Sequence, residues 1–438
     1  MAITTWWLGR NSETSATVVV RCDSTQNVTV SAGGVSAVAA CNSGVHDGIA
    51  VATLTGLSPG AKYAYTVDGA AGGTLRTKPA GDGYWLAFSS CWKLTRPDVL
   101  AYKLLQHFDV DALFTLGDFP YMNANGTWNG VALTPIDGGT LAAGQDQANR
   151  YAFHRSQRLT PGIKEFMRSA PTYSTVDDHE YDPDNSVPQS LAWFQTHFPG
   201  ATEGDRAASM GAARNAVLAY HQGNPQDTGD TYFSVDIGNA TVWMTDLIWQ
   251  RSRPVDADTS AKRLMTLTQR NWLLDGMAAR PGRFHVWGCS KQMISSCGRN
   301  ADWWDAVGTN PGYRTELREI LSDTRFPVRG FLSVTGDEHI ASDLFIRQDM
   351  MGVTHPGFSQ ISAGPASIDV ITNPNEGLAY RDGVRSKERD TSGVADRGEN
   401  NYVLLRVLPD RVERYVLGSR YGLRYMGYVG TQDNLVRR

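Results

Sequence analysis

The stretch FTLGDFPY at residues 114–121 decides how the rest of the sequence is interpreted. Residues 112–116 form a short apolar run that is typical of a buried strand, and the run stops at Gly117. A carboxylate, Asp118, follows directly. Ligands of open α/β sheets bind at the carboxyl ends of the strands. If Asp118 is functional, other strands should therefore end in metal-ligating or proton-transferring residues.

Polar residues follow several other apolar runs in the same way. Predicted strands 85–88, 171–176, 240–245, 284–287 and 330–335 are followed by SSC (89–91), DDHE (177–180), Asp246, GCS (288–290) and GDEH (336–339). Helices are predicted over 97–107, where Thr95 is a plausible N-cap, over 151–168 and over 260–277. Alternation of strands and helices favours βαβ units. Residues 122–150 are rich in Gly, Asn and Thr and predict a loop near the site.

The first 79 residues have a different pattern. Short predicted strands alternate there with Gly, Ser, Asn and Pro, which favours a small all-β domain of immunoglobulin or fibronectin type. Residues 79–83 indicate a linker. We therefore predict a β-sandwich over 1–79, followed over 84–438 by an α/β domain in which two sheets pack face to face with helices outside. The polar strand ends should gather along one rim of that domain.

Composition excludes some classes of function. The 438 residues include 41 basic and 45 acidic ones with no long run of either sign, so the chain has no electrostatic footprint for nucleic acid. No apolar segment approaches the roughly 20 residues of a membrane-spanning helix. Two local disulfides are possible among the five cysteines, Cys22 with Cys41 and Cys289 with Cys297, and they would leave Cys91 unpaired. Free thiols in a reducing compartment are the alternative.

The strand ends suggest metal chemistry if they converge. Carboxylates and a phenolate suit Fe(III), Ca(II) or Mn(II), a thiolate shifts the preference toward iron, and imidazole accepts most transition metals. A two-metal centre can hold a phosphate ester and lower the pKa of a bound water. Each residue alone also has a structural interpretation: Cys91 as a buried thiol, Asp118 as a turn cap, Tyr121 as a packed aromatic, and His339 as a core histidine.

Four motifs in this order carry a resemblance: SSC (89–91), GDFPY (117–121), VDDHE (176–180) and GDEH (336–339). Together they resemble the PhoD-type alkaline phosphatases and phosphodiesterases of the calcineurin-like metallophosphoesterase superfamily. The segments DLIWQR (246–251) and QRNWL (269–273) also resemble that family, as does the position of the early β-rich region. The resemblance covers nearly the whole chain.

The resemblance implies a binuclear or larger centre of Fe3+ and Ca2+. Cys91, Asp118, Tyr121 and His339 would bind the ferric ion, and Asp118 would bridge to a calcium site shared with Asp178 and Asp337. The implied nucleophile is metal-activated water. His179 would contact the phosphoryl oxygens and protonate the leaving group. Asp246 and Arg251 are candidates either for supporting the ligands or for contacting phosphate. The wider superfamily has a further His ligand where this chain has GCSKQ (288–292), a difference that is compatible with PhoD-like proteins.

The implied function is metal-dependent hydrolysis of phosphoric esters, either monoesters or diesters, with a small phosphate ester as the substrate. Phospholipase D-like or phosphotriesterase activity on the same fold is the alternative, because loops rather than metals choose the ester. A non-catalytic phosphate-binding protein is the alternative from another class. The cysteine pattern and the family's habit favour export to the periplasm or the cell exterior, although residues 1–6 have no signal character, and a cytoplasmic location is the alternative.

Overall fold

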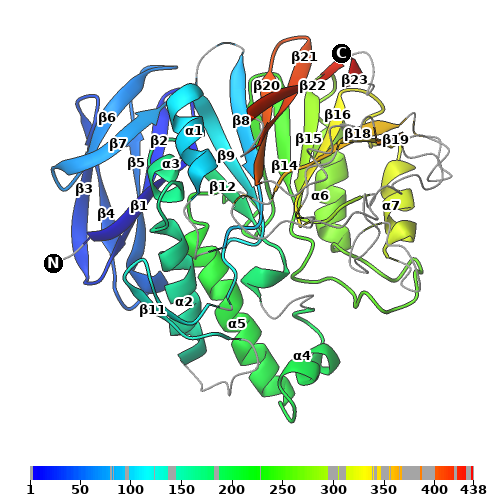
Figure 1. The fold of residues 1–438 in the computed structure, drawn as a ribbon, viewed down its shortest axis with the longest axis horizontal. Helices are drawn as coiled ribbons and strands as arrows, with labels where there is room; N and C mark the ends of the chain where they lie inside the picture. The colour runs from blue at the N-terminus through cyan, green and yellow to red at the C-terminus, as the bar shows by residue number, and fades with distance from the viewer. Residues whose placement is uncertain are drawn as a thin grey trace.

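The fold is seen in a computed structural model (Figure 1). It describes residues 3–78, 81, 83–93, 98–122, 124–136, 145–181, 187–226, 228–293, 304, 312–337, 339, 343–346, 355, 357–364, 366, 385–386, 400–418, 422–430 and 436–437. Within these ranges the chain forms an α/β fold with several sheets and seven α-helices.

The N-terminal region is all β. One sheet has the order β1 (Ile3–Asn11), β2 (Ser15–Cys22) and β5 (Ile49–Thr55); the other has the order β4 (Val35–Cys41), β3 (Gln26–Ala32), β6 (Lys62–Val67) and β7 (Ala70–Arg76). Alternate residues of both sheets, such as Val18 and Val28, share one apolar core. The predicted immunoglobulin or fibronectin type and the boundary at residue 79 stay predictions. Cys22 and Cys41 are free thiols whose Sγ atoms lie 2.9 Å apart in this core, and Cys297 lies outside the described residues.

Two larger sheets, each of seven strands within the described ranges, follow. The first has the order β12 (Thr172–Thr175), β9 (Val110–Leu116), β8 (Tyr84–Ser89), β20 (Asn401–Val407), β21 (Arg411–Gly418), β22 (Gly422–Gly430) and β23 (Val436–Arg437). The second has the order β13 (Phe233–Ile237), β14 (Ala240–Met244), β15 (Phe284–Cys289), β16 (Phe331–Thr335), β18 (Phe358–Ser362), β17 (Asp343–Ile346) and β19 (Arg385–Ser386). Strands β8, β9 and β12 are parallel, as are β14, β15, β16 and β18.

The two large sheets pack face to face through one apolar core. Phe88 and Phe114 stack at 4.8 Å on the first sheet and share the cluster with Val242, Val286 and Val334 of the second. These strands are apolar on consecutive residues because helices cover the outer face of each sheet as well. Both faces of the central strands are thus buried, which is why short apolar runs predicted them.

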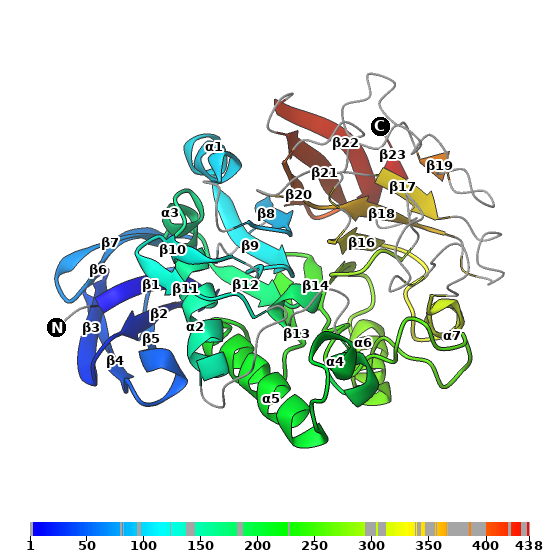
Figure 2. The ribbon, with the colours of Figure 1, turned by 60° about the horizontal axis from the view of Figure 1, so that its bottom comes forward.

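Helices cover the outer faces. α1 (Val99–His107) and α3 (Ile163–Met167) pack on the first sheet, and α6 (Leu267–Ala278) and α7 (Arg314–Leu321) pack on the second. α2 (Gln145–Arg158), α4 (Leu191–His197) and α5 (Glu203–Tyr220) extend below the sheets (Figure 1). Figure 2 shows the N-terminal strands on the side of α2 and α5, and α6 and α7 on the opposite side. The described residues also form two short 3-10 helices, η1 (His46–Gly48) and η2 (Asp178–Glu180).

Several helix predictions were wrong in their bounds. α1 begins after Asp98, whose side chain accepts a hydrogen bond from the Ala101 amide, and Thr95 lies outside the described residues. The helix predicted over 151–168 is two helices, because Gly162 adopts a φ of 91° between them. The helix predicted from 260 begins only after Thr266, which caps α6 through Gln269. The segment predicted as a loop over 122–150 contains β10 (Gly126–Trp128), β11 (Val131–Leu133) and the start of α2.

The N-terminal sheets support the rim that carries Asp118. Trp7 of β1 stacks on Tyr220 of α5, with ring centroids 6.0 Å apart. The buried Arg158 guanidinium lies over the rings of Trp7, Phe119 and Tyr220 at 4.8, 5.4 and 4.7 Å from their centroids. Since Phe119 is the neighbour of Asp118, the first strand of the chain packs one layer behind this residue.

The close approach of β1 to the segment after α5 requires glycine. The amide of Arg10 donates a 2.7 Å hydrogen bond to the Gly223 carbonyl, and a Cβ on Gly9 would lie 2.5 Å from Gly223 Cα. We expect Gly9→Ala to lower the free energy of unfolding by about 1–3 kcal/mol, because the two backbones must separate. Urea denaturation measures this change. Gly44→Ala is the matched control, since its Cβ would meet only the Asn42 side chain at 3.5 Å; equal stability of the two variants would contradict the packing described.

Candidate metal centre

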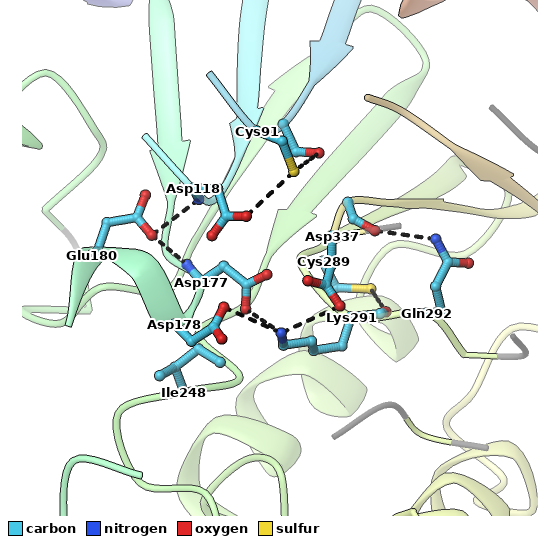
Figure 3. Close-up of polar contacts among 12 residues, drawn as sticks. Cys91, Asp118, Asp177, Asp178, Glu180, Ile248, Cys289, Lys291, Gln292 and Asp337 are labelled. Carbon is cyan, nitrogen blue, oxygen red and sulfur yellow. Dashed lines mark hydrogen bonds and ion pairs between the residues drawn. The ribbon is translucent and has the colours of Figure 1, made fainter. Parts of the chain in front are cut away.

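The polar strand ends meet at one rim of the two large sheets (Figure 3). Six polar residues each lie two positions beyond the last residue of a strand: Cys91 after β8, Asp118 after β9, Asp177 after β12, Asp246 after β14, Lys291 after β15 and Asp337 after β16. The Thr175 hydroxyl donates a 2.7 Å hydrogen bond to the Thr245 carbonyl and so joins the ends of β12 and β14 across the two sheets. Parallel strands packed in this way bring chemistry from distant parts of the sequence to one edge.

The first group of side chains converges on one oxygen of Asp118. The Cys91 thiol lies 3.3 Å from Asp118 Oδ2, and the Tyr121 hydroxyl donates to the same oxygen at 2.7 Å. The Tyr121 hydroxyl is also 2.8 Å from His339 Nε2. A sulfur, a carboxylate, a phenol and an imidazole from three strand ends thus lie in contact with one another.

This group fits a metal ion. Asp118 is buried, yet its Oδ1 atom has no hydrogen-bond partner among the described residues, which is costly for a carboxylate. Burial, and after it the charge of Asp118, raises the pKa of the Cys91 thiol and of the Tyr121 phenol well above their usual ranges. A cation bound here would reverse both effects by favouring the thiolate and the phenolate. Cys91, Asp118 and His339 offer ligand atoms within 4.8 Å of one another.

The second group is acidic and contains a lysine. Asp118, Asp177, Asp178 and Asp337 offer oxygens within 4.8 Å of one another. The Lys291 ammonium lies among them, 2.7 Å from Asp177 Oδ1, 3.5 Å from Asp178 Oδ1 and 3.4 Å from Asp337 Oδ2 (Figure 3). Burial raises the pKa of Asp177, and the charge of Lys291 opposes this rise. The expected ligands of a second ion are therefore together, but a cation of the protein already lies between them.

His179 joins both groups. It offers a ring nitrogen within 4.8 Å of ligand atoms of Asp118 and Asp178. Its ring centroid lies 4.1 Å from that of Tyr121, and the side chain is only half-buried. His179 is therefore at the solvent side of the cluster.

The backbone is strained at three of the predicted ligands. Cys91, Asp118 and Asp337 adopt positive φ angles of 62°, 55° and 65°. Residues other than glycine rarely occupy this region, and each costs on the order of 1–3 kcal/mol. The turn at each strand end directs the side chain into the cluster, so the strain is concentrated where ligands are needed.

Glu180 is a positioning residue to which sequence reasoning gave no role. Its buried carboxylate accepts hydrogen bonds from the backbone amides of Asp118 at 3.0 Å, Phe119 at 2.6 Å and Asp177 at 2.8 Å. Burial, and then the charge of Asp118, raises the pKa of Glu180. One side chain thereby fixes the turn after β9 against the turn after β12. The signals in the sequence were its place in a run of four titratable residues and in the VDDHE motif (176–180).

Asp246 and Arg251 are held in a turn beside the cluster. The Asp246 carboxylate accepts hydrogen bonds from the Thr231 hydroxyl and from the amides of Ile248 and Trp249, the latter two at 2.9 Å. Asp246 also lines a separate pocket of about 300 Å³ together with Trp249. Arg251 is buried in the same turn, and its amide donates to the Ile248 carbonyl. Figure 3 shows Ile248 beside Asp178, so this turn borders the cluster. Asp246 holds the turn through the amides of Ile248 and Trp249.

Comparison with known proteins agrees with this arrangement. The family model of the PhoD-like phosphatases matches residues 86–414. The chain belongs to the PhoD-like phosphatase family. This membership supports a phosphoester hydrolase with metal cofactors, small phosphate esters as substrates and the acidic rim as the candidate metal-binding region.

Two solved structures share the fold. A structure of PhoD is 14% identical, with a TM-score of 0.72 over 99% of this chain and 92% of that chain. The purple acid phosphatase PPD1 from yellow lupin (Lupinus luteus) seeds is 12% identical, with a TM-score of 0.58 over 99% of this chain and 73% of that chain. No curated protein sequence matches the chain. Across the part of the chain that the structure describes, no helix is long and apolar enough to cross a membrane.

We expect Glu180→Gln to lower the affinity for the metal, although Glu180 is not itself a predicted metal ligand. Glutamine keeps one acceptor oxygen and turns a donor toward backbone amides, so at least one of the three hydrogen bonds is lost and the fold loses about 1–3 kcal/mol. The affinity for the metal should fall about 10- to 100-fold. The variant should therefore retain less metal per chain than wild type after gel filtration, as measured by plasma mass spectrometry. Glu203→Gln, at the exposed start of α5, is the control. Full metal retention in Glu180→Gln would contradict the positioning role.

Proposed function

We propose that the chain hydrolyses phosphoric mono- and diesters at the centre formed by Cys91, Asp118, Tyr121 and His339. The observation that carries the proposal is that Cys91, Tyr121 and His339 gather around the buried carboxylate of Asp118, one oxygen of which has no hydrogen-bond partner among the described residues. The mixture of thiolate, phenolate, carboxylate and imidazole favours Fe(III) over magnesium or calcium at this position. Family membership supports the same class of reaction.

The bound ion would supply Lewis acidity toward the phosphoryl oxygen and lower the pKa of a water molecule. The chain's own residues supply the rest. Asp118 holds the centre through a buried carboxylate that Glu180 fixes through the backbone. His179, half-buried beside Tyr121, is the candidate for a hydrogen bond to the phosphoryl oxygen and for proton donation to the leaving-group oxygen.

Roles for Asp178, Asp337, Asp246 and Arg251 follow from their surroundings. Asp178 and Asp337 form ion pairs with Lys291, so their negative charge is partly neutralised by this lysine. Asp246 keeps the turn of Ile248 and Trp249 in place, and its contacts support positioning more than contact with phosphate. Arg251 remains the candidate in this turn for binding a phosphoryl oxygen.

The test is hydrolysis of matched chromogenic phosphate mono-, di- and triesters by protein purified with iron, with a chelator-treated sample alongside. We expect turnover that the chelator abolishes and that Asp118→Asn lowers by at least about 100-fold, because the shared ligand loses its charge. Tyr151→Phe, a half-buried tyrosine of α2, is the control and should keep full activity.

The ratio of diester to monoester turnover identifies the preferred class. Turnover of the triester or of a phospholipid alone would move the assignment to phosphotriesterase or phospholipase D-like activity. An iron-loaded protein that turns over none of these esters would contradict the proposal and favour a non-catalytic phosphate-binding role.

A further inference from the structure

We infer that the ammonium group of Lys291 takes the place of the second metal ion, so that the chain binds one ion tightly instead of two. The inference rests on the metal centre of the proposed function and concerns its composition. It departs from what the motif resemblance implies, namely a calcium ion shared by Asp118, Asp178 and Asp337.

The first observation is geometric. The Lys291 Nζ atom lies within 3.5 Å of an oxygen of each of Asp177, Asp178 and Asp337. The same residues, with Asp118, form the acidic group whose oxygens lie close enough to share one cation. A single ammonium with three donors therefore contacts the carboxylates that would otherwise surround a divalent ion.

The second observation is burial. The side chains of Lys291 and Asp177 are 0% exposed, that of Asp178 is 3% exposed and that of Asp337 is 12% exposed. A buried lysine is rare unless it is paired, and buried carboxylates likewise need a counter-charge. Lys291 and the three aspartates provide each other with the counter-charge that buried ionised groups need. A divalent cation held by the same oxygens would face a like charge at close range in a setting that screens charge poorly.

The third observation is that the main chain around Lys291 is firmly held. Gln292 donates through Nε2 to the Gly336 carbonyl at 3.1 Å and to Ser362 Oγ at 2.8 Å. The Met293 amide donates to Gln360 Oε1 at 2.9 Å. The segment after β15 that carries Lys291 is thus tied to the turn after β16 and to β18 itself, and the stem of Lys291 is directed into the rim (Figure 3).

The experiment counts ions and does not use turnover. Metals per chain are measured by plasma mass spectrometry after dialysis, and thermal unfolding is followed with and without added Ca2+. Wild type should hold close to one ion per chain, and Ca2+ should leave its midpoint unchanged. Lys291→Gln removes the internal cation, so this variant should gain a second ion from Ca2+, bind Ca2+ at least tenfold more tightly than wild type, and unfold at a higher temperature when Ca2+ is present.

Two controls complete the design. Lys291→Arg keeps the charge and should behave as wild type, and Lys262→Gln removes another buried lysine, which donates to the Pro254 carbonyl away from the rim, and should also leave the ion count unchanged. Two tightly bound ions per chain in wild type would overturn the inference even if Lys291→Gln failed to fold. Equal Ca2+ responses of wild type and Lys291→Gln would overturn it as well. Wild type without any ion would count against the proposed function, while the Ca2+ response of Lys291→Gln would still decide the role of the lysine.

Discussion

The rest of the structure depends on the burial of the Asp118 carboxylate among other acidic groups. Cys91, Tyr121 and three further aspartates lie around it in a rim that is largely closed to water. Such a concentration of acidic groups is unfavourable unless positive charge is present. We propose that a cation bound at Asp118 supplies the first positive charge, and the Lys291 ammonium, which lies among Asp177, Asp178 and Asp337, is the second.

The turns after the strands hold the predicted ligands of the cation at Asp118 in place. Strand ends with positive φ direct ligands inward at Cys91, Asp118 and Asp337, and Glu180 holds the turn of Asp118 by accepting backbone amides. Behind that turn, Arg158 packs between Phe119 and aromatic rings of β1 and α5. These contacts hold the predicted ligands in place from several sides, which is the preorganisation that a metal-binding site needs.

The sequence predicted the strand ends well and the contacts between them poorly. Buried parallel strands are apolar on both faces, so short runs such as 112–116 stood out, and the polar residues after them predicted where Cys91, Asp118 and His339 would meet. Helix ends were less predictable, because capping by Asp98 or Thr266 depends on single hydrogen bonds. α4 and α5 were not predicted at all: α5 is rich in alanine and packs against several elements, so it lacks a clear apolar stripe.

The roles of Glu180 and Lys291 were beyond reach from the sequence. Glu180 acts on Asp118, which is 62 residues away in the chain, and Lys291 acts on aspartates from two other strands. Periodicity and local motifs contain no information on such pairs. The position of Asp246 was predicted correctly as a strand end, but only its hydrogen bonds to Thr231, Ile248 and Trp249 indicate that it supports a turn.

The most direct test of this account is a crystal structure with anomalous diffraction recorded on both sides of the iron absorption edge. The account predicts one strong anomalous peak within ligand distance of Asp118, Cys91, Tyr121 and His339. It also predicts that the Lys291 ammonium, without any anomalous signal, lies between Asp177, Asp178 and Asp337. Absence of the peak at Asp118, or a metal peak among those three aspartates with Lys291 displaced, would contradict the account.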